Sequence, residues 1–394
     1  MTAATHPGLA GRPIYLDYNA TTPVDPEVVA AMVPSLEREF GNPSSTHAYG
    51  RPARAALEAA RDRVAGLLHA GAGRIVFTGS GSEADALAIR GAVLANRRPG
   101  RRPHVITQAT EHPAVLAACR DLEELHGAEI AVLPVGPDGL VDPLAVADAI
   151  TDDTLLVTVM HANNETGTIQ PIAEIAAAAH ERGVLVHCDA AQSTGKIIVD
   201  VAELGVDLLT VVGHKMYAPK GISALYVRDG VALRPLVGGG GQEGGLRAGT
   251  ENVPYAVGLG RAAEVAAAAL EAGETRRLTA LRDRLEAGLK ARLPGWVHLN
   301  GHRTRRLPNT LNVRIDGMRA LTLLDDVAVL AASAGSACHA GEDAPSPVLT
   351  AMGIPADEAM TAVRLSLGRW STEAEVDAAA AAIAAAVPGR SVRR

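Results

Sequence analysis

Seven short apolar segments, separated by stretches with helical periodicity, constrain the fold of this chain more than any other feature. They lie between about residues 55 and 230, are rich in β-branched residues and show little polar alternation. Strands of this kind belong to parallel sheets covered by helices on both faces. We therefore expect an α/β fold with a mostly parallel sheet. The expected strands are residues 74–79, 104–109, 129–135, 154–160, 183–190, 206–212 and 222–227, with helices at 83–98 and 172–183.

The pattern changes after a glycine-rich loop at residues 236–252. An alanine-rich segment follows, and we expect a long helical stretch from about Gly260 to Leu293. A last helix is expected to begin at Thr372, because Glu375 three residues later gives the spacing of a capping box. Residues 307–315 and 363–368 are expected to be strands. The predicted parts are a flexible N-terminal tail (1–13), a large α/β domain (14–258) and a smaller α+β domain (259–394).

The composition excludes several classes of protein. The 394 residues are 47% hydrophobic, which is typical of a soluble globular chain long enough for two domains. A net charge of −7 without a basic block argues against a nucleic-acid surface. We see no run long enough to span a membrane and no signal-peptide layout at the start. Three widely spaced cysteines suggest a reducing compartment without a zinc site or disulfide framework, so we expect a cytoplasmic protein.

Two ionisable residues stand at the ends of apolar strands. Lys215 follows one strand, in "VVGHKMYAPKG", and Asp189 ends another, in "GVLVHCDAAQS". Taken alone, Lys215 could simply reach water, and Asp189 could be a helix N-cap. A buried carboxylate, however, needs a cation nearby. Because parallel sheets place their sites at the carboxyl ends of strands, the two side chains are expected to face one cleft.

Two more features occur at strand ends and point to a cofactor. The segment "FTGSGSEADAL" joins a strand to a helix whose first turn has free N–H groups, an arrangement suited to anions although common among proteins. His112 follows the strand at 104–109. Pyridoxal phosphate (PLP) requires a lysine for its Schiff base, an acid opposite the pyridine nitrogen, a phosphate site and often a flat group against the ring. The four features together therefore favour PLP.

The chain resembles the PLP-dependent cysteine desulfurases, the class-V aminotransferase relatives that serve iron–sulfur assembly and nitrogen fixation. The resemblance covers nearly the whole chain in order. The motifs that carry it are "IYLDYNATTPV" (14–24), "FGNPSSTH" (40–47), "TEH" (110–112), "MHANNETG" (160–167), "HCDAAQS" (187–193), "GHK" (213–215), "GGGGQEGGLRAGT" (238–250), "SAGSAC" (333–338) and "VRLSLGR" (363–369). So many motifs in one order make a chance match very unusual.

The resemblance implies a fold-type I PLP-dependent transferase and a role for each matching residue. Lys215 would hold the cofactor and move the substrate's Cα proton, while His112 would lie over the ring and share in proton transfer. Arg364 would bind the substrate carboxylate with help from Asn19, and Thr250 would reach the phosphate of the other subunit in a homodimer. The remaining implied contacts are Gly81, Ser82 and His214 with the phosphate, Asp189 with the pyridine nitrogen, Gln192 with the phenolic oxygen, and Asn164 with both cofactor and substrate.

Two departures from the family pattern concern the phosphate site. The chain has Val212 where the family usually has a serine before "GHK", so one hydroxyl is missing. The phosphate loop reads "GSGSEA" in place of the more usual Ser-Gly-Ala-Thr-Glu-Ser. Ser82 can replace the threonine hydroxyl, and we therefore expect phosphate binding that is slightly weakened.

Cys338 decides the expected chemistry. Its loop, "SAGSACHAGEDAPSP", consists of small, polar and proline residues, which suits a mobile segment better than the apolar surroundings of a structural cysteine. In the family this thiol takes sulfur from the substrate as a persulfide and alanine is released. His339 would help to lower the pKa of the thiol. Cys119 and Cys188 lie in a helical and a strand pattern, and we expect them to be packing residues.

The sequence leaves other functions open. A selenocysteine lyase shares the scaffold without needing the thiol, an aminotransferase of this fold would need a keto acid and no cysteine, and a non-catalytic scaffold would have lost Lys215, Asp189 or Cys338. The three intact residues favour a homodimeric desulfurase that acts on L-cysteine. Its sulfur acceptor would be an iron–sulfur scaffold, a tRNA-thiolation relay or DNA-phosphorothioation machinery, and we expect no direct contact with nucleic acid or membrane.

Overall fold

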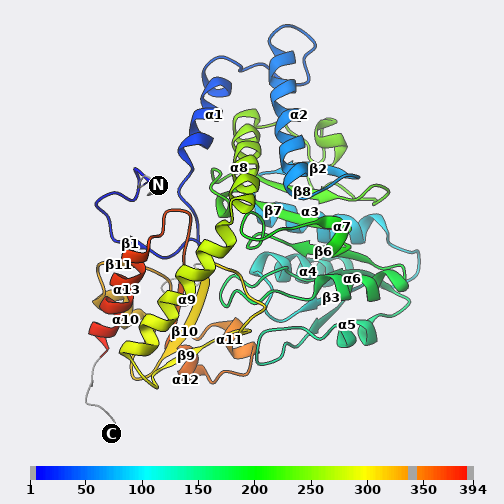
Figure 1. Cartoon of the computed structure of the whole chain (residues 1–394). Coiled ribbons are helices and arrows are strands. Elements are labelled where there is room, and N and C mark those ends of the chain that lie inside the picture. The colour runs from blue at the N-terminus through cyan, green and yellow to red at the C-terminus, as the bar shows by residue number, and fades with distance from the viewer. Residues whose placement is uncertain (1–5, 336–343, 388–394) are drawn as a thin grey trace.

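The computed structural model describes residues 6–335 and 344–387. Its centre is a seven-stranded sheet in the order β2-β8-β7-β6-β5-β3-β4 (Figure 1). All seven strands lie where the apolar segments predict them. Their bounds are β2 (Arg74–Thr78), β3 (His104–Gln108), β4 (Glu129–Leu133), β5 (Thr154–Thr158), β6 (Leu185–Asp189), β7 (Leu208–Val212) and β8 (Ser223–Val227).

Helices cover both faces of this sheet, as the lack of polar alternation requires. Successive strand residues point to opposite faces, so Ile75 and Phe77 join one hydrophobic cluster while Val76 joins another. The first face packs against α1 (Pro26–Glu37), α2 (Gly50–Leu67), α5 (Pro143–Ala149), α6 (Ile172–Glu181), α7 (Val201–Leu204) and α8 (Val253–Glu271). The second packs against α3 (Gly81–Ala95) and α4 (Pro113–His126).

The sheet is mostly parallel, and β8 is its exception. β7, β6, β5, β3 and β4 run parallel to one another, whereas β8 is antiparallel to both β7 and β2. The turn at residues 213–222 is too short to contain the crossover helix that a parallel connection needs. The predicted α/β fold is therefore confirmed, with one reversed strand.

A smaller group of helices and strands lies beside the large sheet (Figure 1), and its buried residues form a separate, second hydrophobic cluster. It is built on the three-stranded antiparallel sheet β12-β10-β9 and on helices α9 and α13. The elements of this region are α9 (Glu274–Arg292), β9 (Val297–Leu299), β10 (Thr310–Ile315), α10 (Ala320–Asp326), α11 (Pro347–Ala351), α12 (Ala356–Ala359), β12 (Ala362–Ser366) and α13 (Glu373–Ala386). The two strands and the last helix are confirmed, and Thr372 and Glu375 form the expected capping box.

The long helical stretch expected from about Gly260 to Leu293 is two helices. α8 begins earlier, at Val253, and α9 begins after Gly273, whose φ of +87° no helix interior contains. α8 packs on the hydrophobic cluster at the first face of the large sheet, whereas α9 packs on the second hydrophobic cluster. The proposed division at residue 258 stays a prediction, and the packing favours a boundary nearer Gly273. Among the described residues, no helix combines the length and apolar character needed to cross a membrane.

The start of the chain joins the two regions. β1 (Ile14–Tyr15) pairs in parallel with β11 (Leu330–Ala331), and Asp17 forms a bridge with Ser366 at the end of β12. Leu16 is buried in the second cluster, while the next residues run to the carboxyl end of the large sheet. Residues 16–22 therefore lie between both parts of the fold.

We predict that Gly260→Ala lowers the thermal unfolding midpoint, although alanine is the better helix former. A Cβ at Gly260 would lie 2.7 Å from Ala60 Cα and 2.9 Å from Ala60 Cβ, where α8 crosses α2. Overpacking costs about 1–3 kcal/mol and exceeds the ~1 kcal/mol gain in helix propensity. Gly66→Ala in α2 is the control, since nothing lies within 4 Å of its Cβ position. It should raise the midpoint, and equal increases in both variants would contradict the packing argument.

Candidate active site

A cavity of about 370 Å³ lies at the carboxyl end of the large sheet. It opens where β5, β6 and β7 end, near Met160, Asp189 and Val212. Ten predicted site residues line it: Asn19, Gly81, Ser82, His112, Asn164, Asp189, Gln192, His214, Lys215 and Arg364. Thr250 is exposed and is not among the lining residues, and Cys338 with its neighbour His339 lies outside the described residues.

Lys215 enters the cavity from a single 3₁₀ turn, Gly213–Lys215, that directly follows β7. Its half-buried ammonium group donates to the main-chain oxygens of Asn19, at 2.6 Å, and Ala20, at 2.8 Å. Residues 19 and 20 thus hold the lysine at the strand end. These contacts answer why a lysine is tolerated after an apolar strand.

Asp189 is the last residue of β6 and is only 6% exposed. Its Oδ1 accepts a hydrogen bond from the Ala191 N–H at 2.9 Å. Burial raises the pKa of Asp189, while His112 and Lys215 act in the opposite direction. A cationic partner in the cavity would relieve this cost, which makes the carboxylate suited to a protonated ring nitrogen.

His112 is the N-cap of α4, and its position follows from that role. Its Nδ1 accepts from the Ala114 N–H at 3.2 Å, which leaves Nε2 as the protonated ring nitrogen. Burial lowers the pKa of His112, with Lys215 acting in the same direction and Asp189 opposing. The neutral imidazole therefore presents a flat face and one N–H to the site.

The part of the cavity lined by the start of α3 and by His214 is suited to an anion. α3 begins at Gly81 with Ser80 as its N-cap, so the first-turn N–H groups and the Ser82 hydroxyl lie at a positive helix end. His214 Nδ1 lies 3.1 Å from Thr21 Oγ1, and burial and neighbouring lysines lower the pKa of His214 to about 4.

Gly81 and Val212 depend on each other. A Cβ at Gly81 would lie 2.6 Å from Val212 Cγ2, so the glycine makes room for the valine. Both positions are ones at which the sequence departs from the pattern that the resemblance implies, alanine and serine. The two departures therefore form one compensated exchange of volume across the helix N-terminus.

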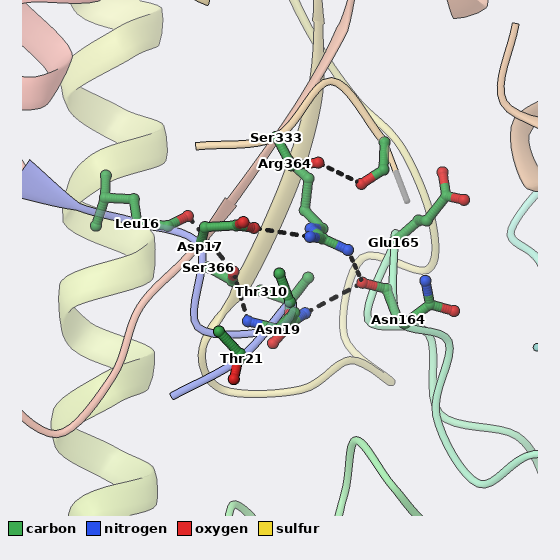
Figure 2. Close-up of polar contacts among 12 residues, drawn as sticks. Leu16, Asp17, Asn19, Thr21, Asn164, Glu165, Thr310, Ser333, Arg364 and Ser366 are labelled. Carbon is green, nitrogen blue, oxygen red and sulfur yellow. Dashed lines mark hydrogen bonds and ion pairs between the residues drawn. The ribbon is translucent and has the colours of Figure 1, made fainter. Parts of the chain in front are cut away.

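Arg364 belongs to β12 and lines the cavity, and it is only 1% exposed. Figure 2 shows its polar contacts. Its Nη2 donates to Asp17 Oδ1 at 2.7 Å and its Nη1 to the Asn164 main-chain oxygen at 3.1 Å. The buried Nε has no hydrogen-bond partner among the described residues. The guanidinium is thus held in place with donor capacity remaining, as carboxylate recognition requires.

Asn19 links this end of the cavity to Lys215. Its Nδ2 donates to Thr310 Oγ1 at 2.9 Å and to the Asn164 oxygen at 3.2 Å (Figure 2). Its main-chain oxygen accepts from Gln192 Nε2 at 3.1 Å, in addition to Lys215. Asn19 therefore sets the relative positions of several groups that line the site.

Sequence reasoning missed two buried acids near Asp189. Asp85 lines the cavity from α3, and burial together with the charge of Asp189 raises its pKa well above its usual value. Burial raises the pKa of Glu111 to about 8, although its Oε1 accepts from the Met160 N–H and from Gln108. An acid on the apolar face of the α3 pattern, between Ala84 and Leu87, was the signal that could have identified Asp85.

The two described cysteines are packing residues. Cys119 in α4 is 2% exposed and burial raises its pKa to about 12, while Cys188 in β6 is fully buried and its pKa is also raised. A thiol in such surroundings is a poor nucleophile. The expectation that neither carries the chemistry agrees with this geometry.

Comparisons with known proteins agree with the fold. The class-V aminotransferase family model matches residues 14–379. A curated cysteine desulfurase of Trichormus azollae is 49% identical over 367 residues, which cover 92% of this chain and 90% of the relative. A NifS-like protein of known structure superposes with a TM-score of 0.86 at 35% identity, covering 95% of this chain and 98% of that one.

A second solved structure, of SspA in complex with cysteine, has a TM-score of 0.77 and 36% identity over 91% of this chain and 99% of that one. These matches extend over almost the whole sequence and agree with the motifs and the sheet. The chain belongs to the class-V aminotransferase family, and curated relatives that are 44–49% identical to it are cysteine desulfurases.

Proposed function

We propose that this protein is a PLP-dependent cysteine desulfurase that converts L-cysteine to L-alanine and passes the sulfur on as a persulfide. The observation that carries the proposal is the convergence of Lys215, Asp189, the N-terminus of α3 and Arg364 on one cavity. A lysine, a buried acid, an anion site and a guanidinium are the groups that PLP and an amino acid need together. The family membership supports the same chemistry.

The residues present fit PLP. Lys215 would form the Schiff base, Asp189 would hold the pyridine nitrogen protonated, and Gln192 would donate to the phenolic oxygen. The α3 N–H groups, Ser82 and His214 would bind the phosphate. When bound, the cofactor supplies an electron sink for the charge that develops at the substrate's Cα.

Substrate binding would depend on Arg364. Its guanidinium, fixed by Asp17 and Asn164, would bind the carboxylate of L-cysteine through the remaining donors. Asn164 and Asn19 would complete this end of the site. A related protein has been solved with cysteine, which supports an amino-acid substrate of this size.

Proton transfer would fall to two side chains. Lys215 Nζ would remove the proton from the substrate's Cα and would return a proton to the portion of the substrate that becomes alanine. His112 Nδ1 accepts from the Ala114 N–H, so Nε2 would carry the ring proton. His112 could give this proton to the substrate during the reaction.

Cys338 would take the sulfur. Its thiolate would attack the sulfur of the bound cysteine, the C–S bond would break, and the electron pair would remain on the substrate portion that becomes alanine. Cys338 would leave the reaction as a persulfide. The acceptor would be an iron–sulfur scaffold, a tRNA-thiolation relay or DNA-phosphorothioation machinery in the cytoplasm.

We further propose a homodimer in which Thr250 contacts the phosphate bound by the partner subunit. The exposed position of Thr250, away from the cavity of its own chain, supports this arrangement. Two-fold dimers are the most frequent closed assemblies.

The cofactor assignment predicts a yellow protein. Purified protein should show visible Schiff-base absorbance, and borohydride should fix the cofactor to the peptide that contains Lys215. Lys215→Ala should lose that linkage and at least about 10³-fold of the activity, because both the Schiff base and the proton carrier are removed. A wild-type protein that stays colourless after incubation with PLP would overturn the proposal.

The exchange between Gly81 and Val212 predicts a second result. Gly81→Ala alone should weaken PLP binding about tenfold or more. The added methyl group would crowd Val212 and displace the helix end, and such overpacking costs about 1–3 kcal/mol. Gly81→Ala combined with Val212→Ser should restore the affinity, because the smaller serine makes room and adds a hydroxyl. Equilibrium dialysis measures both, and a double variant no better than the single one would contradict the coupling.

Cys338→Ser should separate sulfur transfer from the earlier steps. The variant should still bind cysteine with a spectral change, yet release almost no alanine, because a hydroxyl is a far weaker nucleophile than a thiolate at neutral pH. Mass spectrometry of the wild type after brief exposure to cysteine should find added sulfur on the Cys338 peptide and none on Cys119 or Cys188. Wild-type turnover by Cys338→Ser would instead favour a selenocysteine lyase or another elimination.

A further inference from the structure

Lys196 is a buried lysine that the proposed chemistry leaves without a role. It is 7% exposed and stands four residues after Gln192. Its Nζ donates to Gln192 Oε1 at 2.8 Å and to Asn19 Oδ1 at 3.4 Å. A buried lysine usually needs a carboxylate as its partner, because removing the charge from water is costly. Here both contacts are to amide oxygens of residues that line the active-site cavity.

The surroundings of Lys196 favour its uncharged form. Burial lowers the pKa of Lys196 well below its usual value, and the neighbouring charges of Lys215 and Arg364 act in the same direction. A neutral amine keeps two N–H groups, which is enough for both contacts. The position of its donors, rather than its charge, is therefore what Lys196 contributes.

These donors fix how the two amides are turned. Gln192 directs its oxygen to Lys196 and its Nε2 to the main-chain oxygen of Asn19, at 3.1 Å. A flipped Gln192 would place its oxygen against that carbonyl oxygen, so the observed orientation is self-consistent. Asn19 is held similarly, since its Oδ1 also accepts from Asn309 Nδ2 at 3.0 Å while its Nδ2 donates to Thr310.

We propose that Lys196 is a positioning residue that holds the Gln192 amide so that the Nε2 N–H not donated to Asn19 is directed toward the cavity. The same contacts hold Asn19, whose main-chain oxygen accepts from both Gln192 and Lys215. Lys196 thereby acts on the cofactor through Gln192 without touching it. The inference rests on the proposed function, in which Gln192 donates to the phenolic oxygen of PLP.

Lys196→Met tests this role because methionine has an unbranched side chain of similar length but no N–H donors. The readout is the midpoint pH at which the visible absorbance of bound cofactor titrates. A donor to the phenolic oxygen stabilises its negative charge most when the Schiff base has no proton. Losing the donor should therefore raise the midpoint by about one pH unit, the size of one hydrogen bond's effect.

A double-variant cycle shows whether Lys196 acts through Gln192. Gln192→Ala should raise the midpoint by a similar amount, and Lys196→Met/Gln192→Ala should raise it no further than Gln192→Ala alone. Fully additive shifts would overturn the proposal. Lys196→Gln retains an N–H donor and should shift the midpoint less, and it serves as the test if Lys196→Met does not fold.

Thr275→Val is the matched control. The Thr275 hydroxyl donates to the main-chain oxygen of Lys196 at 3.0 Å, so its loss disturbs the same segment but spares the amine. Its midpoint should equal that of the wild type, and a shift like that of Lys196→Met would indicate general loosening and overturn the inference. Lys196→Met protein that binds PLP with an unchanged midpoint would refute the inference alone, whereas a wild-type protein that takes up no PLP would refute the proposed function with it.

Discussion

The site depends on the requirement that buried polar groups find hydrogen-bond partners, and residues 16–22 supply several of them. This segment crosses from the second hydrophobic cluster to the carboxyl end of the large sheet. Its main-chain oxygens accept from Lys215, its Asp17 holds Arg364, and its Asn19 contacts both lysines and the β10 region. Without this segment, Lys215, Lys196 and Arg364 would each lose at least one hydrogen bond.

Charge around the cavity follows from the sheet. Asp189 at the end of β6 lies near Glu111, which follows β3, and near Asp85 of α3, and burial raises the pKa of all three. Burial and neighbouring cationic side chains lower the pKa of two nearby basic residues, Lys196 and His214. A cofactor with a cationic ring nitrogen and an anionic phosphate fits this distribution. Its ring nitrogen would lie beside the acid Asp189, and its phosphate would lie beside the base His214.

Packing constrains the same region. Gly81 leaves space that Val212 fills, and Gly260 lets α8 lie directly on Ala60 of α2. Interiors pack at crystal-like density, so a single methyl group is enough to move a helix end. The anion site is therefore tied to the choice of side chains in a neighbouring strand, which explains how two departures from the family pattern can occur together.

Sequence alone determined the seven strands of the large sheet, the capping box at Thr372 and ten of the residues that line the cavity. Apolar segments without polar alternation define buried strands locally, and strand ends in a parallel sheet converge on one edge. The helix break at Gly273 was missed because residues that favour helices continue on both sides of it. The tertiary structure alone decided that Lys196 contacts Gln192 and Asn19, that Asp17 holds Arg364, and that Gly81 accommodates Val212. Asn19 and Lys196 are 177 positions apart and Asp17 and Arg364 are 347 apart, and no local pattern records which distant side chains will share a buried hydrogen bond.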